Sequence, residues 1–375
     1  MRKIVFYQNI IAPYRIALFN DMELISKTYP DFDFEVLIMR KTRKGRYWNV
    51  DENAFSFKYS IGKGIYFSIL NKYDFHFNPF QLYYLISEKK EIVLGGSWNN
   101  LNVLLLVIGK RIGIVKNKLH IWSEANYLAE RTNNFFSKKL RKWVYNSIDG
   151  KFLVPGNMSV ITFERYNINI KQKMIYFPNL IDSKAFSISE EEISQREYNK
   201  KPVIIITARL IEYRKGILNY LKALGKERLN IVKINILGEG KDRALLQDFI
   251  KKNELEKDIL LHGNLEQKDV INMYKMANIF VLPSFIDPSP LTLVEALHMR
   301  LPIIASKRCG NHFEAVVNKK NGILIDPYSK ESIIESFEFM LNNKENWRKM
   351  GEISYSIAKK KFNSSSVLEN AITNF

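Results

Sequence analysis

Short runs of apolar, often β-branched residues alternate with amphipathic segments along most of the chain. Each run has the length of one β-strand, and the segments between the runs repeat their apolar positions with the period of a helix. The runs are KIVFYQNI, FDFEVLIM, EIVLGG, LHIWSEA and KFLVPG in the first half, and PVIIITAR, VKINILGEG, DILLHG, IFVLPS, LPIIAS and GILID in the second. This alternation predicts parallel β-sheets covered by helices, because a parallel strand needs a long, usually helical, crossover before the next strand.

One polar stretch, SISEEEISQREYNKKP (187–202), interrupts the alternation and is the best linker candidate. The chain has 375 residues, more than a single hydrophobic core usually supports. We therefore expect an α/β protein with two doubly wound, Rossmann-like domains facing a cleft at the carboxyl ends of their strands. The expected parts are an N-terminal domain (1–185), a linker (186–201), a C-terminal domain (202–350) and C-terminal helices (351–375) that cross back to the N-terminal domain.

The composition limits where the protein works and with what chemistry. The longest uncharged apolar run, LNVLLLVIG (101–109), is too short to span a bilayer, and polar residues interrupt the N-terminus, so we expect no signal peptide. The single cysteine, Cys309, excludes an internal disulfide and indicates a reducing, cytoplasmic compartment. The five histidines show no ligand spacing, and the Asp-x-Asp at 31–33 only precedes a strand, so we expect no metal site.

The net charge of +18 is uneven along the chain. Residues 1–180 carry a net charge of +13, and residues 181–375 carry +5. Such an excess predicts an anionic partner on the N-terminal side, and nucleic acid, an anionic membrane surface and a phosphorylated substrate all fit this charge.

Two segments concentrate the basic residues: the loop RKTRKGRYW (40–48) and the segment FFSKKLRKWVY (135–145). As a helix, the second segment places one group of side chains on each face: Leu140, Trp143, Val144 and Ile148 on one, and Lys138, Lys139, Arg141 and Lys142 on the other. An ordinary surface helix that packs its apolar stripe on the sheet explains the same pattern. We expect this packing, with the basic side facing the headgroups of an anionic membrane.

The stretch IDPSPLTLVEALHM (286–299) combines a helix start with two acids. Ser289 followed by Pro290 suits an N-cap and a first helical position, so the N–H groups of Leu291, Thr292 and Leu293 would point out of the helix start as an anion site. Asp287 would lie in the loop beyond that start, and Glu295 more than one turn inside the helix. The alternative is that Asp287 caps a loop and Glu295 pairs with a nearby Arg or Lys.

Two further strand ends carry candidate residues. In ITARLIEYRKGI, Arg209 and Lys215 follow a strand and could neutralise a diphosphate; alternatively, Arg209 makes a salt bridge across the strand end and Lys215 is solvated. In LGEGKD, Gly238 and Gly240 would allow a ligand to approach the backbone closely, or form an ordinary tight turn. The third glycine of the dinucleotide fingerprint is absent, which argues against NAD.

In this order, the motifs resemble the donor domain of the large retaining glycosyltransferase family 4, the group 1 glycosyl transferases, whose fold of two Rossmann-like domains is called GT-B. The resemblance covers nearly the whole chain. Besides the residues above, it rests on LHGNLEQKDVINMYKMANIFVLPS, LPIIAS, CGNHFEAV, NGILIDP and FPNLIDSKAF. Three positions depart from the family pattern: Asp287 stands where glutamate is usual, Pro288–Pro290 where glycines are usual, and Leu180 where glycine is common.

The resemblance implies a role for each matching residue. Glu295 would hold the ribose hydroxyls of a nucleotide, and Asp287 would contact the transferred sugar. Arg209 and Lys215 would hold the diphosphate and stabilise its charge as it leaves. The other donor-binding residues would be Gly238, Gly240, Ser289, Leu291 and Thr292.

On the acceptor side, the resemblance points to two residues that follow strands of the first half. Arg15 comes after QNIIAPY and could meet a phosphate or simply lie at the surface, and Glu124 in WSEAN could line the cleft or be buried against an Arg or Lys. His120 lies too early, inside the strand, to be the histidine that many relatives use in this region.

The expected function is transfer of a sugar from a nucleotide diphosphate-sugar, UDP- or GDP-linked, to a glycan or lipid-linked acceptor with retention of configuration and without a metal. Its expected setting is bacterial surface polysaccharide or glycolipid assembly, in the cytoplasm or peripherally on the inner face of the plasma membrane. A sugar-nucleotide epimerase or hydrolase of the same fold is one alternative, and a basic nucleic-acid-binding protein is another. No nucleic-acid-binding motif supports the latter.

Overall fold

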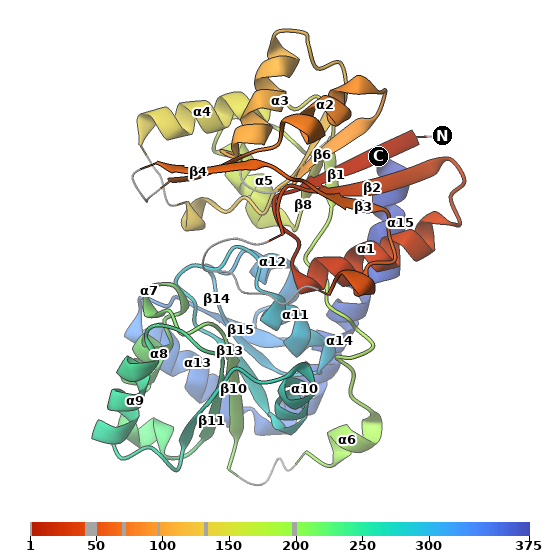
Figure 1. Ribbon diagram of the computed structural model, residues 1–375. Helices are drawn as coiled ribbons and strands as arrows, with labels where there is room; N and C mark the ends of the chain where they lie inside the picture. The colour runs from red at the N-terminus through yellow and green to blue at the C-terminus, as the bar shows by residue number, and fades with distance from the viewer. Residues whose placement is uncertain (1, 42–50, 70–72, 96–97, 131–133, 197–200) are drawn as a thin grey trace. The chain divides into compact units, whose positions relative to one another are not determined.

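The computed structural model describes residues 2–41, 51–69, 73–95, 98–130, 134–196 and 201–375 (Figure 1). The basic loop 40–48 noted above falls almost entirely outside these residues. The chain divides into two compact units: unit 1 comprises Met1–Leu180 and Ser364–Phe375, and unit 2 comprises Ile181–Asn363. Each unit is a parallel sheet covered by helices, so the predicted α/β class with two doubly wound, Rossmann-like domains is confirmed.

Unit 1 is built on a seven-stranded parallel sheet. In spatial order its strands are β3 (Tyr59–Ile61), β2 (Phe32–Ile38), β1 (Arg2–Gln8), β6 (Glu91–Gly95), β7 (Lys118–Trp122), β8 (Phe152–Val154) and β9 (Met174–Tyr176). A separate antiparallel hairpin joins β4 (Ile65–Ile69) to β5 (Tyr73–Phe77).

Helices cover both faces of this sheet. The helices of unit 1 are α1 (Pro13–Ser26), α2 (Pro79–Ser87), α3 (Leu101–Arg111), α4 (Phe135–Asn146), α5 (Asn157–Glu164) and α15 (Ser364–Asn374), with short 3-10 turns at Glu52–Ala54 and Tyr127–Ala129. Side chains of β1 alternate between the faces, as a strand requires: Val5 and Tyr7 join the core formed with α2 to α5. On the other face, Phe6 packs edge-on against Phe19 of α1 and against Phe375.

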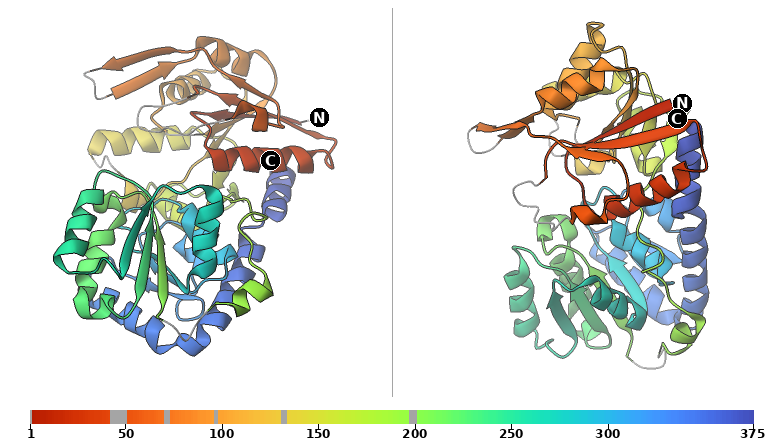
Figure 2. Two further views of the ribbon diagram at one scale, coloured as in Figure 1. Left: turned by 60° about the horizontal axis from the view of Figure 1, so that its bottom comes forward. Right: turned by 45° about the vertical axis from the view of Figure 1, so that its right-hand side comes forward.

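Unit 2 contains a six-stranded sheet whose described ladders are all parallel. In spatial order its strands are β12 (Ile259–Gly263), β11 (Lys233–Leu237), β10 (Val203–Thr207), β13 (Ile279–Leu282), β14 (Ile303–Ser306) and β15 (Gly322–Ile325). Its helices are α6 (Glu190–Ser194), α7 (Glu212–Lys215), α8 (Ile217–Leu229), α9 (Arg243–Lys252), α10 (Gln267–Met276), α11 (Leu291–His298), α12 (His312–Ala315), α13 (Lys330–Asn342) and α14 (Trp347–Lys361), with a 3-10 turn at Lys344–Asn346. Figure 2 shows helices on both sides of this sheet, with α8, α9 and α13 sharing one core.

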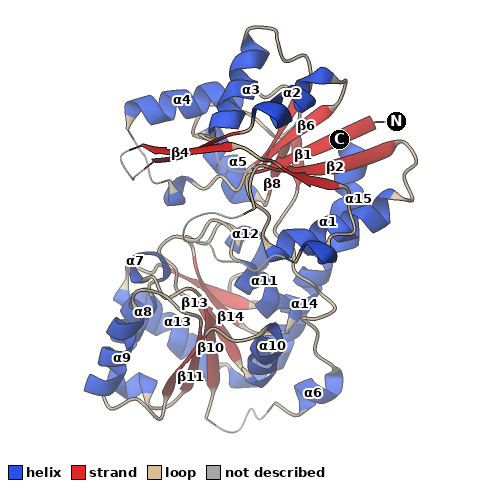
Figure 3. Cartoon of the chain, in the orientation of Figure 1, coloured by secondary structure: helices blue, strands red, loops and turns tan. Residues whose placement is uncertain are grey.

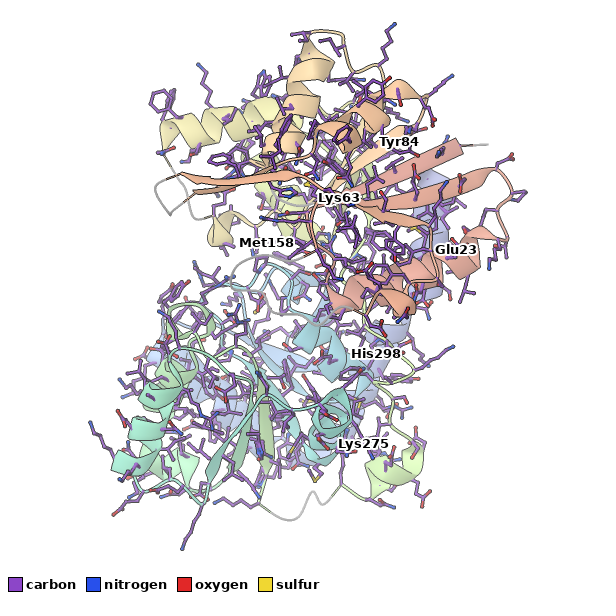
Figure 4. All side chains as sticks on the ribbon, in the orientation of Figure 1. Glu23, Lys63, Tyr84, Met158, Lys275 and His298 are labelled. Carbon is purple, nitrogen blue, oxygen red and sulfur yellow. The ribbon has the colours of Figure 1, made fainter. Side chains whose placement is uncertain are left out.

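The described part of the expected linker belongs to unit 2. Ser189 and Glu192 form a capping box at the start of α6, and the Glu192 carboxylate also pairs with Lys275 of α10 at 2.5 Å (Figure 4). The Arg196 guanidinium donates to the carbonyl oxygens of Met299 and Arg300 at 2.6 and 3.0 Å. The polar residues therefore cap a short helix and anchor it to the core of unit 2.

The C-terminal helices divide between the units. α14 packs beside α11 and α12 within unit 2, whereas α15 packs beside α1 and β9 within unit 1. The Ser364 hydroxyl at the start of α15 donates to the Asp21 carboxylate of α1. The segment expected to leave the C-terminal domain at residue 351 thus joins unit 1 from residue 364 onwards.

The helix α4 differs from its predicted amphipathic arrangement. Arg141, predicted on the basic outer face, is buried, where its guanidinium pairs with the Glu130 carboxylate and contacts the Tyr166 hydroxyl. Leu140, predicted on the inner face, is instead exposed. The long arginine side chain reaches a buried carboxylate. The helical periodicity of apolar and basic residues cannot predict such a contact, because the partner lies outside the helix.

Candidate functional site

The candidate donor residues of unit 2 lie at the point where its strand order reverses. The chain runs from β10 outward to β11 and β12, then returns to the other side of β10 with β13, so the switch point lies between β10 and β13. Loops that follow adjacent parallel strands separate at such a point, and ligands bind there, beyond the carboxyl ends. Arg209 follows β10, and Asp287 follows β13. The topology therefore brings two predicted loops to one edge of the sheet.

An ion pair connects these two loops. The Lys215 ammonium at the end of α7 pairs with Oδ2 of Asp287, and both side chains are largely buried. Backbone contacts hold the loops together as well, since the Ile286 N–H donates to the Arg214 carbonyl at 2.9 Å. The alternatives in which Lys215 is solvated or Asp287 only caps a loop are therefore wrong for this structure.

Gly216 makes this contact possible. It follows Lys215 in the left-handed region, with φ of 61°, and a Cβ there would lie 2.8 Å from the Pro283 carbonyl oxygen. The preceding turn is also fixed from the other side: the Glu212 carboxylate accepts hydrogen bonds of 2.8 Å from the N–H groups of Leu218 and Asn219. The Lys215 side chain thus stands on a turn whose two ends are both fixed.

Glu295 contacts a tyrosine, so the alternative in which it pairs with a nearby Arg or Lys is wrong. Its carboxylate accepts a hydrogen bond of 2.9 Å from the hydroxyl of Tyr274, a buried residue of α10, and not from an Arg or Lys. Burial raises the pKa of Glu295 to about 7, and the Tyr274 hydrogen bond opposes that rise. The Tyr274 ring is held between Phe280 of β13 and Phe186. Glu295 is therefore an acid whose carboxylate is held by a tyrosine hydroxyl and not by a cation.

The start of α11 also departs from the prediction. Pro290, not Ser289, is the N-cap, and Ser289 lies one residue earlier, buried. The Asn311 amide donates to the Pro290 carbonyl at 3.0 Å and fixes this turn. Leu291 and Thr292 form the first helical positions and are partly exposed, as an anion site requires. A proline N-cap offers no side-chain acceptor, so the helix begins without a side-chain cap.

Gly238 and Gly240 contact the chain's own backbone. A Cβ on Gly238 would lie 2.1 Å from the Ala208 carbonyl oxygen, and one on Gly240 would lie 2.2 Å from that of Leu210. The Leu210 N–H in turn donates to the Glu239 carbonyl at 2.9 Å. The two glycines thus let the loop after β11 press on the loop that carries Arg209. Their first role is to position Arg209's loop, which does not depend on a ligand.

The Arg209 side chain is exposed at the end of β10. No ion pair joins its guanidinium to any residue that the structure describes, so the alternative of a salt bridge across the strand end is wrong for these residues. Its charge is therefore available to an anionic ligand.

In unit 1, the two predicted acceptor-side residues contact each other. The Arg15 guanidinium lies 3.3 Å from the Glu124 carboxylate, stacks 3.7 Å above the Trp122 ring and donates to Gln8 Oε1 at 2.7 Å. Asn179 donates to the same Glu124 oxygen at 3.0 Å. Gln8 and Trp122 end β1 and β7, so this cluster lies at the carboxyl edge of the sheet of unit 1. The alternative that Glu124 pairs with an Arg is correct, but its carboxylate remains partly exposed.

Sequence reasoning missed four contributors to these sites: Tyr274, Gln8, Trp122 and Asn179. All four lie within segments that the family resemblance uses, but nothing in the spacing of those segments identifies their partners. Among the residues that the structure describes, no group of three or more His, Cys, Asp or Glu side chains is arranged to hold a metal ion. No helix in the described part of the chain is long and apolar enough to cross a membrane.

Comparison with known proteins connects this geometry to a family. Residues 188–356 match the family model described as "Glycosyl transferases group 1". This region is therefore similar to the group 1 glycosyl transferases. It contains Arg209, Lys215, Asp287 and Glu295, so these candidate residues all lie inside the matched region.

Individual relatives agree with this assignment. The chain is 31% identical over 169 residues to a probable sucrose-phosphate synthase of Vicia faba, a match that covers 40% of this chain and 16% of that protein. It is 24% identical over 257 residues to an uncharacterized glycosyltransferase of Methanocaldococcus jannaschii, covering 62% of this chain and 63% of that protein. The chain thus spans only about a sixth of the plant relatives that it matches.

Solved structures show that the resemblance in fold extends beyond the matched region. Anabaena Alr3699/HepE, solved in complex with UDP, superposes with a TM-score of 0.73 and 16% identity, covering 99% of this chain and 98% of that one. At this identity the likeness concerns the fold alone. The two units therefore have the GT-B arrangement of strands and helices.

Proposed function

We propose that the protein is a glycosyltransferase that moves a sugar, with retention of configuration, from a nucleotide diphosphate-sugar to an acceptor hydroxyl. One observation carries this proposal: the Lys215–Asp287 pair stands at the β10–β13 switch point of the region that matches the group 1 glycosyl transferases. A cation and an acid side by side suit the two ends of a glycosyl–phosphate bond. The cation meets the diphosphate and the acid meets the sugar hydroxyls.

In the proposed reaction, the bond between the anomeric carbon and the diphosphate breaks as the acceptor oxygen bonds to that carbon from the same face. The acceptor proton passes to the departing phosphate oxygen, so no protein base is required. Lys215 and Arg209 stabilise the charge that develops on the diphosphate, with N–H groups of Leu291 and Thr292 assisting. Glu295 holds the ribose hydroxyls, Asp287 contacts the sugar beside Ser289, and Gly238 and Gly240 border the nucleotide.

A UDP-linked donor is the first choice, because the fold resembles a protein solved with UDP. The acceptor side is assigned to Arg15 and Glu124 of unit 1, whose guanidinium and carboxylate suit a glycan or a lipid-linked diphosphate sugar. We further assign the enzyme to bacterial surface polysaccharide or glycolipid assembly, without a metal and peripherally on an anionic membrane.

Thermal unfolding with UDP, GDP, ADP and CMP tests the donor site. One nucleotide should stabilise the wild type by an amount corresponding to about 2.7 kcal/mol at a hundred times its dissociation constant. Glu295→Ala should abolish that shift. If no nucleotide stabilises the wild type, the donor-site assignment fails. If a stabilising nucleotide's sugar conjugate is broken down at the same rate with and without any glycan acceptor, a hydrolase or epimerase replaces the transferase.

A further inference from the structure

The large hydrophobic side chains that the protein exposes are concentrated on three helices of unit 1. Of nineteen such residues in the described chain, ten lie on α2, on α3 with the turn to Ile114, or on α4. The most exposed are Phe80 at 82%, Phe136 at 80%, and Phe135 and Tyr83 at 72% each. We call the solvent-facing side of these three segments the outer helical surface. Single exposed hydrophobic residues are ordinary, but such a concentration indicates a surface that meets an apolar partner.

The three helices form one layer, so their exposed sides belong to a common surface. Leu85 of α2, Val107 of α3 and Val144 of α4 all enter the same core over one face of the sheet. Figure 3 labels these three helices. The ends of α3 and α4 are joined, because Nε of Arg111 donates to the Ser147 hydroxyl at 2.7 Å. The opposite sides of these helices consequently point away from the sheet.

The charge of this layer has one sign. Residues 79–87, 101–118 and 134–148, which include α2, α3 and α4, contain no Asp or Glu. Lys138 and Lys139 are exposed on α4 between the exposed Phe136 and Leu140, and Arg111 and Lys116 are exposed beside the end of α3. Cations and apolar side chains thus alternate along the surface, while Arg141, the buried cation of α4, is neutralised by Glu130.

We propose that the outer helical surface docks on an anionic lipid bilayer. Exposed rings would enter the boundary between headgroups and acyl chains, while lysine ammonium groups stay among the phosphates. A second copy of the chain fits less well, because lysine is depleted in the core of protein interfaces and two such surfaces would repel each other. This docking deepens the proposed function. It rests on that function in one respect: a lipid-linked acceptor would lie at the same membrane.

A pocket beside the first turn of α2 gives the surface a place for one headgroup. It has a volume of about 500 Å³ and is lined by Phe80, Gln81, Tyr84, Lys58 and Lys63, among others. Figure 4 labels Tyr84 and Lys63. Oε1 of Gln81 is buried there without a hydrogen-bond partner, so it can accept from a headgroup hydroxyl. The one carboxylate in the wall, Glu35, is already matched by Lys3 and Lys58 at 3.7 and 3.8 Å.

Co-sedimentation of the full chain with vesicles tests the proposal. The wild type should bind vesicles of phosphatidylglycerol and phosphatidylcholine at low salt, should bind pure phosphatidylcholine at least tenfold more weakly, and should be released at about 0.5 M salt. Phe135→Ser with Phe136→Ser should weaken binding by about tenfold or more, since each substitution removes a ring that would bury apolar surface in the bilayer. Lys138→Glu with Lys139→Glu should weaken it by about twentyfold or more, at roughly fivefold for each lysine removed.

Matched controls come from α9 of unit 2. Lys251 and Lys252 are exposed neighbours on that helix, so Lys251→Glu with Lys252→Glu changes the net charge equally, and Leu245→Ser removes an exposed hydrophobic residue. Both should bind vesicles like the wild type. If the control variants lose as much vesicle binding as the variants of α4, the effect comes from net charge and the proposal is overturned. Failure of the wild type to bind anionic vesicles at low salt would also overturn it.

Two further measurements distinguish the remaining outcomes. If the wild type is a dimer that Phe135→Ser with Phe136→Ser dissociates, the surface belongs to a second copy, and the lipid proposal is overturned. Nucleotide-induced thermal stabilisation should be unchanged in every variant, because none lies in unit 2's donor site. Stabilisation without vesicle binding would overturn the docking and the assignment to an anionic membrane but leave the donor site, and vesicle binding without stabilisation would overturn only the donor site.

Discussion

The ammonium of Lys215 and the carboxylate of Asp287 form an ion pair across the ends of two neighbouring strands, β10 and β13. The pair is largely buried, so each charge has lost much of its hydration. The attraction between the two opposite charges offsets that loss. It also occupies the positions assigned to the diphosphate and the sugar. The pair therefore connects the loop after β10 to the loop after β13.

Replacing one partner should destabilise the protein more than replacing both. Lys215→Met and Asp287→Asn should each cost about 1–3 kcal/mol in the free energy of unfolding, because one charge is left without its partner. The double variant should recover about 1–3 kcal/mol of the summed loss. Urea unfolding of the four proteins measures this coupling. Losses that simply add would show that the two side chains do not stabilise each other.

The same two variants should act in opposite directions on nucleotide binding. Asp287→Asn releases the Lys215 ammonium for the diphosphate, so UDP should bind as tightly as to the wild type, or more tightly. Lys215→Met removes a cation and leaves an anion beside the phosphates, and UDP affinity should fall at least about tenfold. Calorimetric titration measures both. A tighter complex with Lys215→Met would remove this lysine from the donor site.

The pH dependence of stability should report on Glu295. Its pKa is raised from an ordinary 4.5 to about 7, so the folded protein binds a proton that the unfolded chain has lost between these values. The stability of the wild type therefore falls as the pH rises from about 4.5 to about 7, by up to about 3 kcal/mol, and is then constant. Glu295→Gln should lack this loss. Comparing the free energies of unfolding of the two proteins at pH 5 and pH 8 measures it, and a constant difference would contradict the shifted pKa.

Tyr274→Phe provides a companion to that experiment. The Tyr274 hydroxyl donates to the Glu295 carboxylate and lowers its pKa, so removing the hydroxyl should raise the pKa further. The pH at which stability becomes constant should then move above that of the wild type. UDP binding at pH 7 should also weaken, because less of Glu295 is ionised to accept the ribose hydroxyls.

The packing role of Gly240 can be separated from any role in ligand binding. A Cβ at this position would meet the Leu210 carbonyl carbon and oxygen at 2.6 and 2.2 Å, so Gly240→Ala should destabilise the protein by about 2–4 kcal/mol. Gly225→Ala is a control, since no atom lies within 4 Å of its Cβ and its cost comes only from a φ of 73°. Thermal unfolding without nucleotide compares them. Equal costs would show that the loop after β11 yields easily.

The sequence predicted the strands and the order of the loops well, because buried β-branched runs and a period of 3.6 are local signals. It placed Asp287 and Lys215 in separate motifs, and only the strand order β12-β11-β10-β13 shows that these motifs meet. The family resemblance supplied roles for them, but not their contact with each other.

Other features lay beyond a local pattern. Tyr274 reaches Glu295 across two elements, and Arg141 reaches Glu130 through the core, so neither partner follows from spacing along the chain. The strands β3, β4, β5 and β9 were not predicted. β3 and β9 are only three residues long, and β4 and β5 form a separate antiparallel hairpin outside the strand–helix alternation. Pro290 became the N-cap because the loop from β13 is held by Asn311, a tertiary contact that overrides the preference for serine.

Arg15 should affect sugar transfer without affecting nucleotide binding. Its guanidinium is shared among Gln8, Trp122 and Glu124, so Arg15→Ala removes a cation and leaves the Glu124 carboxylate with Asn179 as its remaining hydrogen-bond donor among the described contacts. We expect about a hundredfold loss in transfer to an anionic acceptor, while the thermal shift caused by UDP stays unchanged. Arg15→Lys keeps the charge but loses the stacked, forked geometry, so it should recover only part of the activity. An unchanged transfer rate in both variants would remove this cluster from the acceptor site, whereas a lost UDP shift would show that Arg15 also supports the donor site.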